Sequence, residues 1–405
     1  MNEKEIIIKK NNRVLFVETE KGICIVQEEN EFDYDTTKEK VSKMEKKERG
    51  IEFQYGAVHL FVTRRCNMNC SFCAMNANMN VIPEKEMTIN DLKDKVVPFL
   101  KMANPRKIIV TGGEPLVRSD IREIVKVLKE EVGCVIIVQS NGTLVNEKVL
   151  EKLVGYVDEI DYSIGHMLED KGSLIENVKR TKEKVTENVV LSYVYTGNVE
   201  EMLTAFAVAR ELDVELMVTP VTPIGRGKDV RIDNINQLDL YINMALYILE
   251  NNLENSVLVN NLFTGVSFMK SCGGLGRGLA IYPEGEVHMC KCIEDRVDYV
   301  GNAFTDKPDE LLDTWKANTQ KTEIRELFHV DYKEMCKNCE YRYLCGGMCG
   351  GELLQNNNES DCSVRKHMLE FMLFYYEKDL TVRDNIVSLL KYFSKKKEEL
   401  LRELR

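Results

Sequence analysis

Three cysteines at C-x3-C-x2-C spacing, Cys66, Cys70 and Cys73, directly follow the apolar run Ala57 to Thr63 and constrain this chain more than any other feature. Iron-sulfur clusters are usually held by four cysteine thiolates. Three cysteines on one loop therefore predict a cubane cluster with one iron left open to a non-protein ligand. The alternative from this motif alone is zinc, which prefers four ligands and often takes them in C-x2-C pairs.

A second segment, Gly112-Gly113-Glu114-Pro115, follows the apolar run 108–110 and precedes a helix-like stretch over residues 119–132. Two adjacent glycines allow the backbone to come close to a ligand. With Phe72 just before the third cysteine, the two motifs resemble the radical S-adenosylmethionine (SAM) family. In that family the open iron binds SAM, the Gly-Gly-Glu-Pro segment touches the SAM amino group, and one electron cleaves SAM to a 5′-deoxyadenosyl radical. Two motifs in the family's order disfavour zinc.

Between residues 57 and 220, short apolar runs alternate with amphipathic stretches. Strands are expected at residues 58–62, 107–111, 135–139, 159–163, 189–195 and 215–219. Near-continuous apolar strands separated by helices predict an α/β fold with a parallel sheet buried on both faces. Six such units suggest a partial (β/α)6 TIM barrel, whose ligands bind beyond the carboxyl ends of the strands. Both motifs lie at those ends.

Polar residues after later strands match the family's SAM contacts less closely. Ser140 and Asn141 follow the third strand and Ser163 follows the fourth; each could equally form a turn. The segment from Ser163 reads Ser-Ile-Gly-His where the family often has Ser-Ile-Asp-Gly and a later arginine, so no arginine matches here. Asn198 is the remaining candidate for the SAM carboxylate, although with Glu201 it could also cap a helix.

A second group of cysteines follows the expected barrel, with Gly285-x4-Cys290 and then a C-x2-C-x5-C-x3-C run. Its spacing resembles the SPASM extension, which holds two auxiliary 4Fe-4S clusters. The resemblance assigns the first cluster to Cys272, Cys290 and Cys349. It assigns the second cluster to Cys336, Cys339, Cys345 and Cys362. A zinc knuckle on the C-x2-C-x5-C-x3-C run is the alternative, which the first motif disfavours.

Cys292 is extra to the seven-cysteine SPASM pattern. Either it is the fourth ligand of the first auxiliary cluster, or that cluster has an iron open to substrate. If residues 287–292 form a strand, Cys290 and Cys292 share a face, because side chains alternate with period two. The remaining cysteines, Cys24 and Cys134, lie in apolar runs and are expected to be small buried hydrophobes.

Composition limits the classes of protein that need considering. The chain has 405 residues, enough for more than one domain, with 44% hydrophobic and 30% charged residues. No apolar stretch approaches the roughly 18 residues that span a bilayer, and the acidic start is unlike a signal peptide, so we expect a cytoplasmic protein without a membrane partner. A net charge of -11 argues against general nucleic-acid binding.

The expected organisation has four parts. Residues 1–55 form a small α+β element with strands at 6–8, 14–17 and 23–26 and a helix at 38–49. It resembles a shortened winged-helix element that captures a precursor's leader, and a plain hairpin packed on the barrel fits as well. Residues 56–230 form the radical SAM barrel, 231–365 a bridging helix and the SPASM domain, and 366–405 amphipathic helices.

The resemblance implies a peptide-modifying enzyme with SAM and three 4Fe-4S clusters, one in the barrel and two auxiliary. Its partners would be a precursor peptide and a flavodoxin- or ferredoxin-type electron donor. We expect maturation of a ribosomally made peptide by a thioether cross-link, as in sactipeptides. One rival is an anaerobic sulfatase-maturing enzyme, which has an aspartate after the cysteine matching Cys290; Lys291 stands here, and an ammonium is a poor base. The other is a non-catalytic iron-sulfur or zinc protein.

Overall fold

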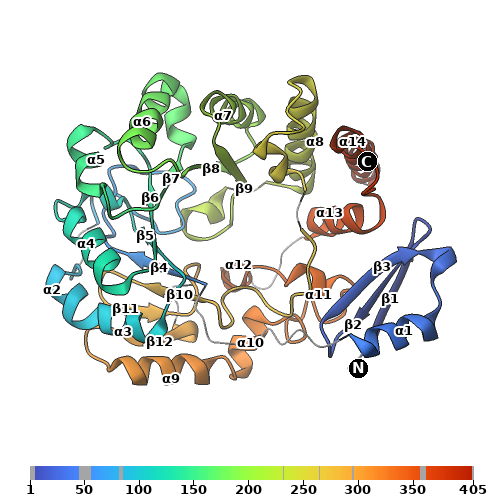
Figure 1. The fold of residues 1–405 in the computed structure, drawn as a ribbon, viewed down its shortest axis with the longest axis horizontal. Helices are drawn as coiled ribbons and strands as arrows, with labels where there is room; N and C mark the ends of the chain where they lie inside the picture. The colour runs from blue at the N-terminus through green and yellow to red at the C-terminus, as the bar shows by residue number, and fades with distance from the viewer. Residues whose placement is uncertain are drawn as a thin grey trace.

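The structure is a computed structural model that describes residues 5–44, 56–81, 85–230, 232–263, 265–293, 296–355 and 362–403. In these ranges one sheet has nine strands in the order β12-β11-β10-β4-β5-β6-β7-β8-β9, and a separate antiparallel sheet has the order β1-β2-β3. Figure 1 shows the large sheet surrounded by helices and the small sheet set apart near the N-terminus. The α/β class is confirmed.

Six neighbouring strands pair in parallel and form the barrel sheet. They are β4 Ala57–Phe61, β5 Lys107–Thr111, β6 Val135–Ser140, β7 Glu159–Ser163, β8 Val189–Tyr195 and β9 Glu215–Pro220. Each lies within one residue of its predicted bounds. The helices between them are α2 Ile89–Asp91, α3 Val97–Ala103, α4 Ile121–Val127, α5 Glu147–Leu153, α6 Lys171–Lys184 and α7 Val199–Leu212.

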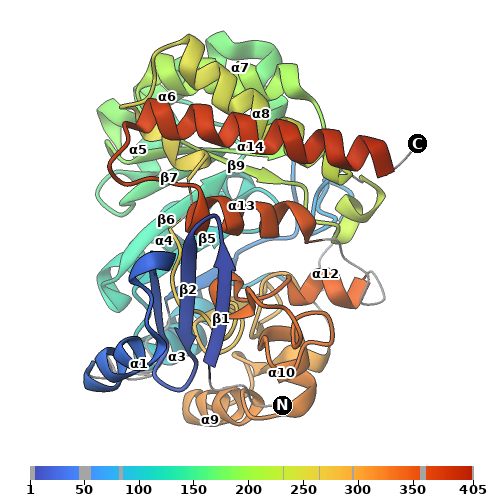
Figure 2. The same ribbon diagram turned by 90° about the vertical axis from the view of Figure 1, so that its right-hand side faces the viewer.

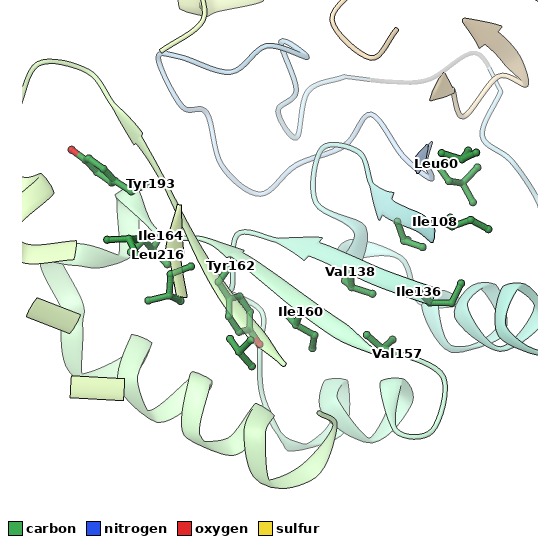
Figure 3. Close-up of a cluster of buried hydrophobic side chains, with 14 of the residues drawn as sticks. Leu60, Ile108, Ile136, Val138, Val157, Ile160, Tyr162, Ile164, Tyr193 and Leu216 are labelled. Carbon is green, nitrogen blue, oxygen red and sulfur yellow. The ribbon is translucent and has the colours of Figure 1, made fainter. Parts of the chain in front are cut away.

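The middle of the barrel sheet is buried on both faces, as predicted, since Ile136, Ile137 and Val138 on β6 are all buried although they alternate in direction. The outer face packs on the helices through fully buried side chains such as Leu60, Ile160 and Tyr162 (Figure 3). The inner face carries polar residues, and Met217 on β9 is 43% exposed there. The described sheet runs from β12 to β9 without closing.

Three strands from the second cysteine region extend the barrel sheet. They are β10 Gly278–Ile281, β11 Glu286–His288 and β12 Tyr299–Asn302. Strand β10 runs parallel to β4, and β11 and β12 continue antiparallel. Because β11 ends at His288, Cys290 and Cys292 lie beyond the strand, and the predicted shared strand face is wrong. The chain turns instead, since the Cys290 N–H donates to the Asp298 carboxylate at 3.0 Å.

Helices complete the C-terminal half. Their bounds are α8 Asn234–Glu250, α9 Pro308–Asn318, α10 Thr322–Phe328, α11 Arg342–Cys345, α12 Gly350–Gln355, α13 Ser363–Phe374 and α14 Val382–Glu403. The long helix α14 lies along α8 (Figure 2). None of the described helices is long and apolar enough to cross a membrane.

The N-terminal element consists of β1 Glu5–Lys10, β2 Arg13–Glu18, β3 Ile23–Glu28 and α1 Tyr34–Lys43. One face of its sheet, including Ile6 and Leu15, packs in one cluster with Tyr341 of the cysteine-rich segment and Leu369 of α13. Helix α1 begins four residues earlier than predicted, because the Asp33 side chain accepts the Thr36 N–H and caps it. The later part of the predicted helix, residues 45–49, lies outside the described residues.

Candidate active site

The C-x3-C-x2-C loop leaves the carboxyl end of β4, as the barrel prediction requires. Cys66 is buried, and Cys70 and Cys73 are partly exposed. The loop folds back on itself, because the Cys73 N–H donates to the Cys70 carbonyl at 3.3 Å and the Met68 N–H to Cys66 Sγ at 3.4 Å. Burial raises the pKa of the Cys66 and Cys70 thiols, and charge repulsion from Cys73 adds to the rise at both.

Gly112 and Gly113 pack against the strand that leads into this loop. The Gly113 N–H donates to the Thr63 carbonyl at 2.8 Å, and the Glu114 N–H to the Arg65 carbonyl at 2.9 Å. A Cβ on Gly112 would lie 2.4 Å from the Thr63 oxygen, and one on Gly113 only 2.2 Å from the Arg65 oxygen. Close packing of two backbones therefore requires both glycines, a reason that the sequence alone did not supply.

The Glu114 side chain points into the protein. It is fully buried, and its carboxylate accepts the Leu116 N–H at 2.9 Å, the Ser140 hydroxyl at 2.9 Å and the Asn141 N–H at 2.7 Å. Burial raises the pKa of Glu114, and these hydrogen bonds oppose the rise. Glu114 thus ties the ends of β5 and β6 together, with Ser140 as its buried partner.

Asn141 reaches from the end of β6 to the cysteine loop. Its Nδ2 donates to Asn67 Oδ1 at 2.9 Å and lies 3.8 Å from Cys66 Sγ. Its carbonyl lies 2.9 Å from His166 Nε2. The structure therefore brings the predicted pair of Cys66 and Asn141 together, and any contact of Asn141 with SAM stays a prediction.

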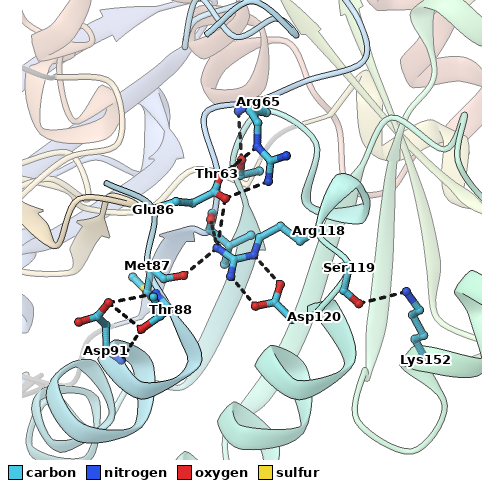
Figure 4. A network of polar contacts seen from close by, with 11 residues as sticks. Thr63, Arg65, Glu86, Met87, Thr88, Asp91, Arg118, Ser119, Asp120 and Lys152 are labelled. Atoms are coloured by element: carbon cyan, nitrogen blue, oxygen red, sulfur yellow. Dashed lines mark hydrogen bonds and ion pairs between the residues drawn. The ribbon is translucent and has the colours of Figure 1, made fainter. Parts of the chain in front are cut away.

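A buried arginine braces the base of the site (Figure 4). The Arg118 guanidinium donates to the Val62 carbonyl at 2.9 Å, to the Met87 carbonyl at 2.8 Å and to the Asp120 carboxylate at 2.6 Å. Nearby, Arg65 donates to Glu86 at 2.9 Å. These bonds hold the end of β4, from which the cysteine loop departs, to the segment that follows Gly-Gly-Glu-Pro.

Arg226, which is not among the residues predicted from the sequence, holds the cysteine loop from the far side of the barrel. Its Nε donates to the Cys70 carbonyl at 2.7 Å, its Nη2 to the Ala77 carbonyl at 3.0 Å, and its backbone N–H to the Cys73 carbonyl at 3.0 Å. A Cβ on Gly225, at φ +55°, would lie 2.3 Å from the Ala74 oxygen. The Gly-Arg-Gly run after the sixth strand was the available signal.

A cavity of about 230 Å³ opens beside the cysteine loop. Cys70 and Phe72 line one side, and His166, Tyr193 and Glu201 are among the residues of the other. Tyr193 donates to Glu201 at 2.8 Å; burial, and then this bond, raise the pKa of Tyr193.

Ser163 and Asn198 are not among the residues that line this cavity. The Asn198 side chain accepts the Glu201 N–H at 3.1 Å and so caps α7. The capping interpretation of Asn198 is confirmed, whereas its contact with the SAM carboxylate, like that of Ser163 with SAM, stays a prediction.

The inner face of the barrel carries a line of polar side chains. Asp161 is buried and accepts hydrogen bonds from Gln139 at 2.9 Å and from Ser192 at 2.6 Å. Burial raises its pKa, and the positive charge of Lys291 acts in the opposite direction. Burial and the Lys291 charge lower the pKa of His59 to about 3. Lys291, beside the Cys290 ligand candidate, thus acts electrostatically on the barrel interior.

The cysteines assigned to the first auxiliary cluster lie near one another. The Cys292 N–H donates to Cys290 Sγ at 3.4 Å, and the interaction between the Cys292 and Cys349 side chains shifts the pKa of both thiols. The hydrogen bond with Cys290 raises the pKa of Cys292 to about 12. Cys272 interacts electrostatically with Cys349. Cys292 therefore lies near Cys290 and Cys349, and its role as a fourth ligand stays a prediction.

The second auxiliary set is equally close. Cys336, Cys339, Cys345 and Cys362 line one pocket beside α11 and α13. All thirteen cysteines are free thiols, so each is available as a ligand. Among the described residues, no group of three or more Cys, His, Asp or Glu side chains is arranged to hold a metal ion. The ligand assignments stay predictions.

Comparison with known proteins identifies the domain. Residues 60–233 match the radical SAM superfamily, so the chain contains a radical SAM domain, as the two motifs predicted. That family implies a 4Fe-4S cluster and SAM as cofactors. The three thiols of the β4 loop, with no fourth cysteine on it, fit a cluster that leaves one iron for SAM.

Curated relatives with different activities are similar to this chain. GTP 3′,8-cyclase of Clostridium perfringens is 29% identical over 196 residues, covering 44% of this chain and 58% of the cyclase. The radical SAM cyclopropyl synthase TigE of Paramaledivibacter caminithermalis is 25% identical over 382 residues, covering 82% of this chain and 75% of TigE. The chain spans less than two thirds of the cyclase, and these relatives do not fix a common substrate.

Solved structures share the fold over most of the chain. Streptococcus suis SuiB bound to S-adenosylmethionine has a TM-score of 0.57 at 14% identity, covering 88% of this chain and 96% of SuiB. Native anSMEcpe with bound AdoMet has a TM-score of 0.57 at 15% identity, covering 86% of this chain and 100% of anSMEcpe. SuiB has also been solved with the precursor peptide SuiA, and anSMEcpe with the Cp18Cys peptide.

Proposed function

We propose that this protein is a radical SAM/SPASM enzyme that modifies a ribosomally made peptide by joining a cysteine sulfur to a carbon of another residue. The observation that carries the proposal is the three-cysteine loop at the carboxyl end of β4 with a cavity beside it. The eight cysteines from Cys272 to Cys362 are the proposed ligands of two further clusters. A simple electron carrier needs neither the three-cysteine loop nor a cavity beside it.

The three-cysteine loop and its supports are the proposed SAM site. When bound, the cluster and SAM supply a radical that takes a hydrogen atom from the substrate, and the auxiliary clusters supply an acceptor for an electron. Cys66, Cys70 and Cys73 would hold the cluster, and Phe72 lies on the cavity wall where the rest of SAM would lie. Asn141 and Arg226 hold the loop in shape through the hydrogen bonds described above.

Both auxiliary sets then have four cysteines, with Cys292 completing the first. This favours the fourth-ligand alternative over an iron open to substrate. The peptide thiol would therefore bind in the barrel interior instead of on an auxiliary iron. Forming the carbon-sulfur bond removes one hydrogen atom from the carbon, which the radical takes, and one proton from the cysteine thiol. One electron is also released, for which an auxiliary cluster would be the acceptor. The site therefore needs a group that accepts the thiol proton.

Asp161 is the proposed proton acceptor. It lies on the inner face of β7, and burial raises its pKa, which makes its carboxylate a stronger base than an exposed aspartate. Gln139 and Ser192 hold its two oxygens in place. His59 is a poorer candidate, since its pKa of about 3 leaves it a weak base.

Lys291 argues against formylglycine formation, because the sulfatase-maturing family has an aspartate at this position. The peptide partner is supported by the fold alone, since solved structures of SuiB and anSMEcpe with peptides share it. The sheet β1-β2-β3, with its edge strands β1 and β3, is the proposed leader-binding element. An exposed strand edge can pair with an extended peptide.

Cluster content is the first test. Iron and sulfide are measured after anaerobic reconstitution of the wild type and of the triple variant Cys66→Ala/Cys70→Ala/Cys73→Ala. Three 4Fe-4S clusters predict about 12 irons falling to about eight, with deoxyadenosine released from SAM and dithionite by the wild type alone. Zinc in place of iron, or intact clusters without SAM cleavage, would refute the radical SAM proposal.

Product analysis tests the bond. With candidate cysteine-containing peptides, a thioether predicts a mass lower by two hydrogen atoms and a cysteine that no longer reacts with iodoacetamide. Formylglycine predicts an aldehyde that reacts with a hydrazine on a Cys-x-Pro-x-Arg peptide. Deoxyadenosine release stimulated only by a peptide without cysteine would contradict the thioether proposal and leave the enzyme class intact.

A further inference from the structure

One lysine is buried between the two auxiliary cysteine sets. Lys333 lies between α10 and Cys336, and only 1% of its surface is exposed. Its backbone carbonyl accepts the Cys336 N–H at 2.9 Å. Its ammonium Nζ donates to the Met348 carbonyl. A charged side chain is almost never buried to this extent unless it is paired.

The Met348 carbonyl lies on the short link that joins the two sets. Cys345, assigned to the second cluster, precedes this carbonyl, and Cys349, assigned to the first, follows it. Gly347 makes room for the ammonium, because a Cβ at that position would lie 3.0 Å from Lys333 Nζ. The lysine therefore contacts a short link whose two ends carry a proposed ligand of each cluster.

The charge of Lys333 has no carboxylate partner within ion-pair distance in the part of the chain that the structure describes. Its electrostatic neighbours are cysteines of both sets, Cys272 and Cys349 from the first and Cys336 and Cys345 from the second. Burial lowers the pKa of Lys333, and the negative charge of thiolates at these cysteines opposes that change. Thiolates that bind iron would supply the missing anionic partner.

We propose that Lys333 is a positioning residue whose ammonium is the shared counter-charge of both auxiliary clusters and raises their reduction potentials. The inference rests on the proposed function, because it requires the two clusters. Reduction of a 4Fe-4S cluster adds one electron, here from dithionite, and no proton. A nearby positive charge stabilises the more negative, reduced state, and net charge and hydrogen bonding set the potentials of such clusters.

The test is a redox titration in the Cys66→Ala/Cys70→Ala/Cys73→Ala background, where the auxiliary clusters alone contribute to the electron paramagnetic resonance spectrum. Lys333→Met removes the charge and the hydrogen bond, and Lys333→Gln removes the charge but keeps a donor. Lys337→Met is the matched control, because Lys337 is exposed one turn away and pairs with Glu334.

Both Lys333 variants are expected to lower the reduction potentials of both clusters. At a fixed solution potential, the ratio of reduced to oxidised cluster should fall at least tenfold, which corresponds to about 59 mV for a one-electron couple. Lys337→Met should leave both potentials unchanged. Unchanged potentials in Lys333 variants that retain about eight irons would overturn the proposal, as would a shift confined to one cluster. Background protein without auxiliary iron would instead refute the proposed function.

Cluster loss in the variants is also informative. If Lys333→Met and Lys333→Gln fail to retain iron while Lys333→Arg retains it, the positive charge is required for the pairing, and the proposal stands. If all three variants lose iron, the side chain acts by its shape, and the counter-charge role is overturned.

Discussion

Replacing Arg226 with methionine should loosen the three-cysteine loop without unfolding the barrel. The guanidinium donates to the Cys70 and Ala77 carbonyls at 2.7 and 3.0 Å. Methionine keeps most of the apolar stem and removes both bonds. The backbone bond from residue 226 to the Cys73 carbonyl does not depend on the side chain, so the change isolates the guanidinium.

The magnitude follows from the two hydrogen bonds. A hydrogen bond that involves a charged group contributes about 1.5–3 kcal/mol. Because water can replace part of each bond at these half-buried carbonyls, we expect the two bonds together to contribute about 2–4 kcal/mol. Since 1.4 kcal/mol is a factor of ten, the open form of the loop becomes roughly 30-fold to 1,000-fold more populated.

The assay is the rate of iron loss from the three-cysteine site under a chelator, measured anaerobically with deoxyadenosine formation followed in parallel. Arg226→Met should lose about four irons at least tenfold faster than the wild type and keep the other eight or so. Arg210→Met is the matched control, because Arg210 is exposed and bonds Asn251 far from the loop. Equal rates of iron loss in the wild type and in Arg226→Met would refute the role of the Arg226 side chain in holding the three-cysteine loop.

Other predictions address the barrel interior and the first auxiliary set. Asp161→Asn should keep SAM cleavage and lower cross-linked product at least tenfold, read by mass spectrometry; full product would exclude Asp161 as the base. The pKa of His59 is about 3 in the folded protein against 6.5 ordinarily, so between these two values the unfolded chain binds a proton that the folded protein does not. The free energy of unfolding therefore falls as the pH drops from 6.5 towards 3. His59→Asn should make the melting temperature fall less steeply over this pH range. Cys292→Ala should lose one to four irons of about 12, and a full complement would show that Cys292 is no ligand.

Local spacing explains what could be predicted. The strands β4 to β9 were placed within one residue because runs of apolar residues bounded by polar turns are a property of adjacent positions. The three-cysteine loop and Gly-Gly-Glu-Pro were found for the same reason, since their chemistry depends on residues a few positions apart. The capping role of Asn198 is likewise a three-residue pattern, with Glu201.

Contacts between distant segments could not be read in this way. The buried position of Glu114 and its bond to Ser140 depend on how β5 and β6 pair. Arg226 reaches Cys70 only because the barrel brings the end of β9 to the cysteine loop. Strand β10 pairs with β4, which lies more than two hundred residues earlier in the chain, and no short motif predicts such pairing.

The amino-acid sequence by itself therefore determined the class of domain, the order of the barrel strands and the cysteines available as ligands. The tertiary structure decided which of these residues meet. It placed Cys292 beyond the end of β11 and near Cys349, buried Asp161 on the inner face of the barrel, and buried Lys333 between the two cysteine sets. The physical reason is that ligand spacing along a chain is local, whereas burial and charge pairing are set by packing between segments far apart in sequence.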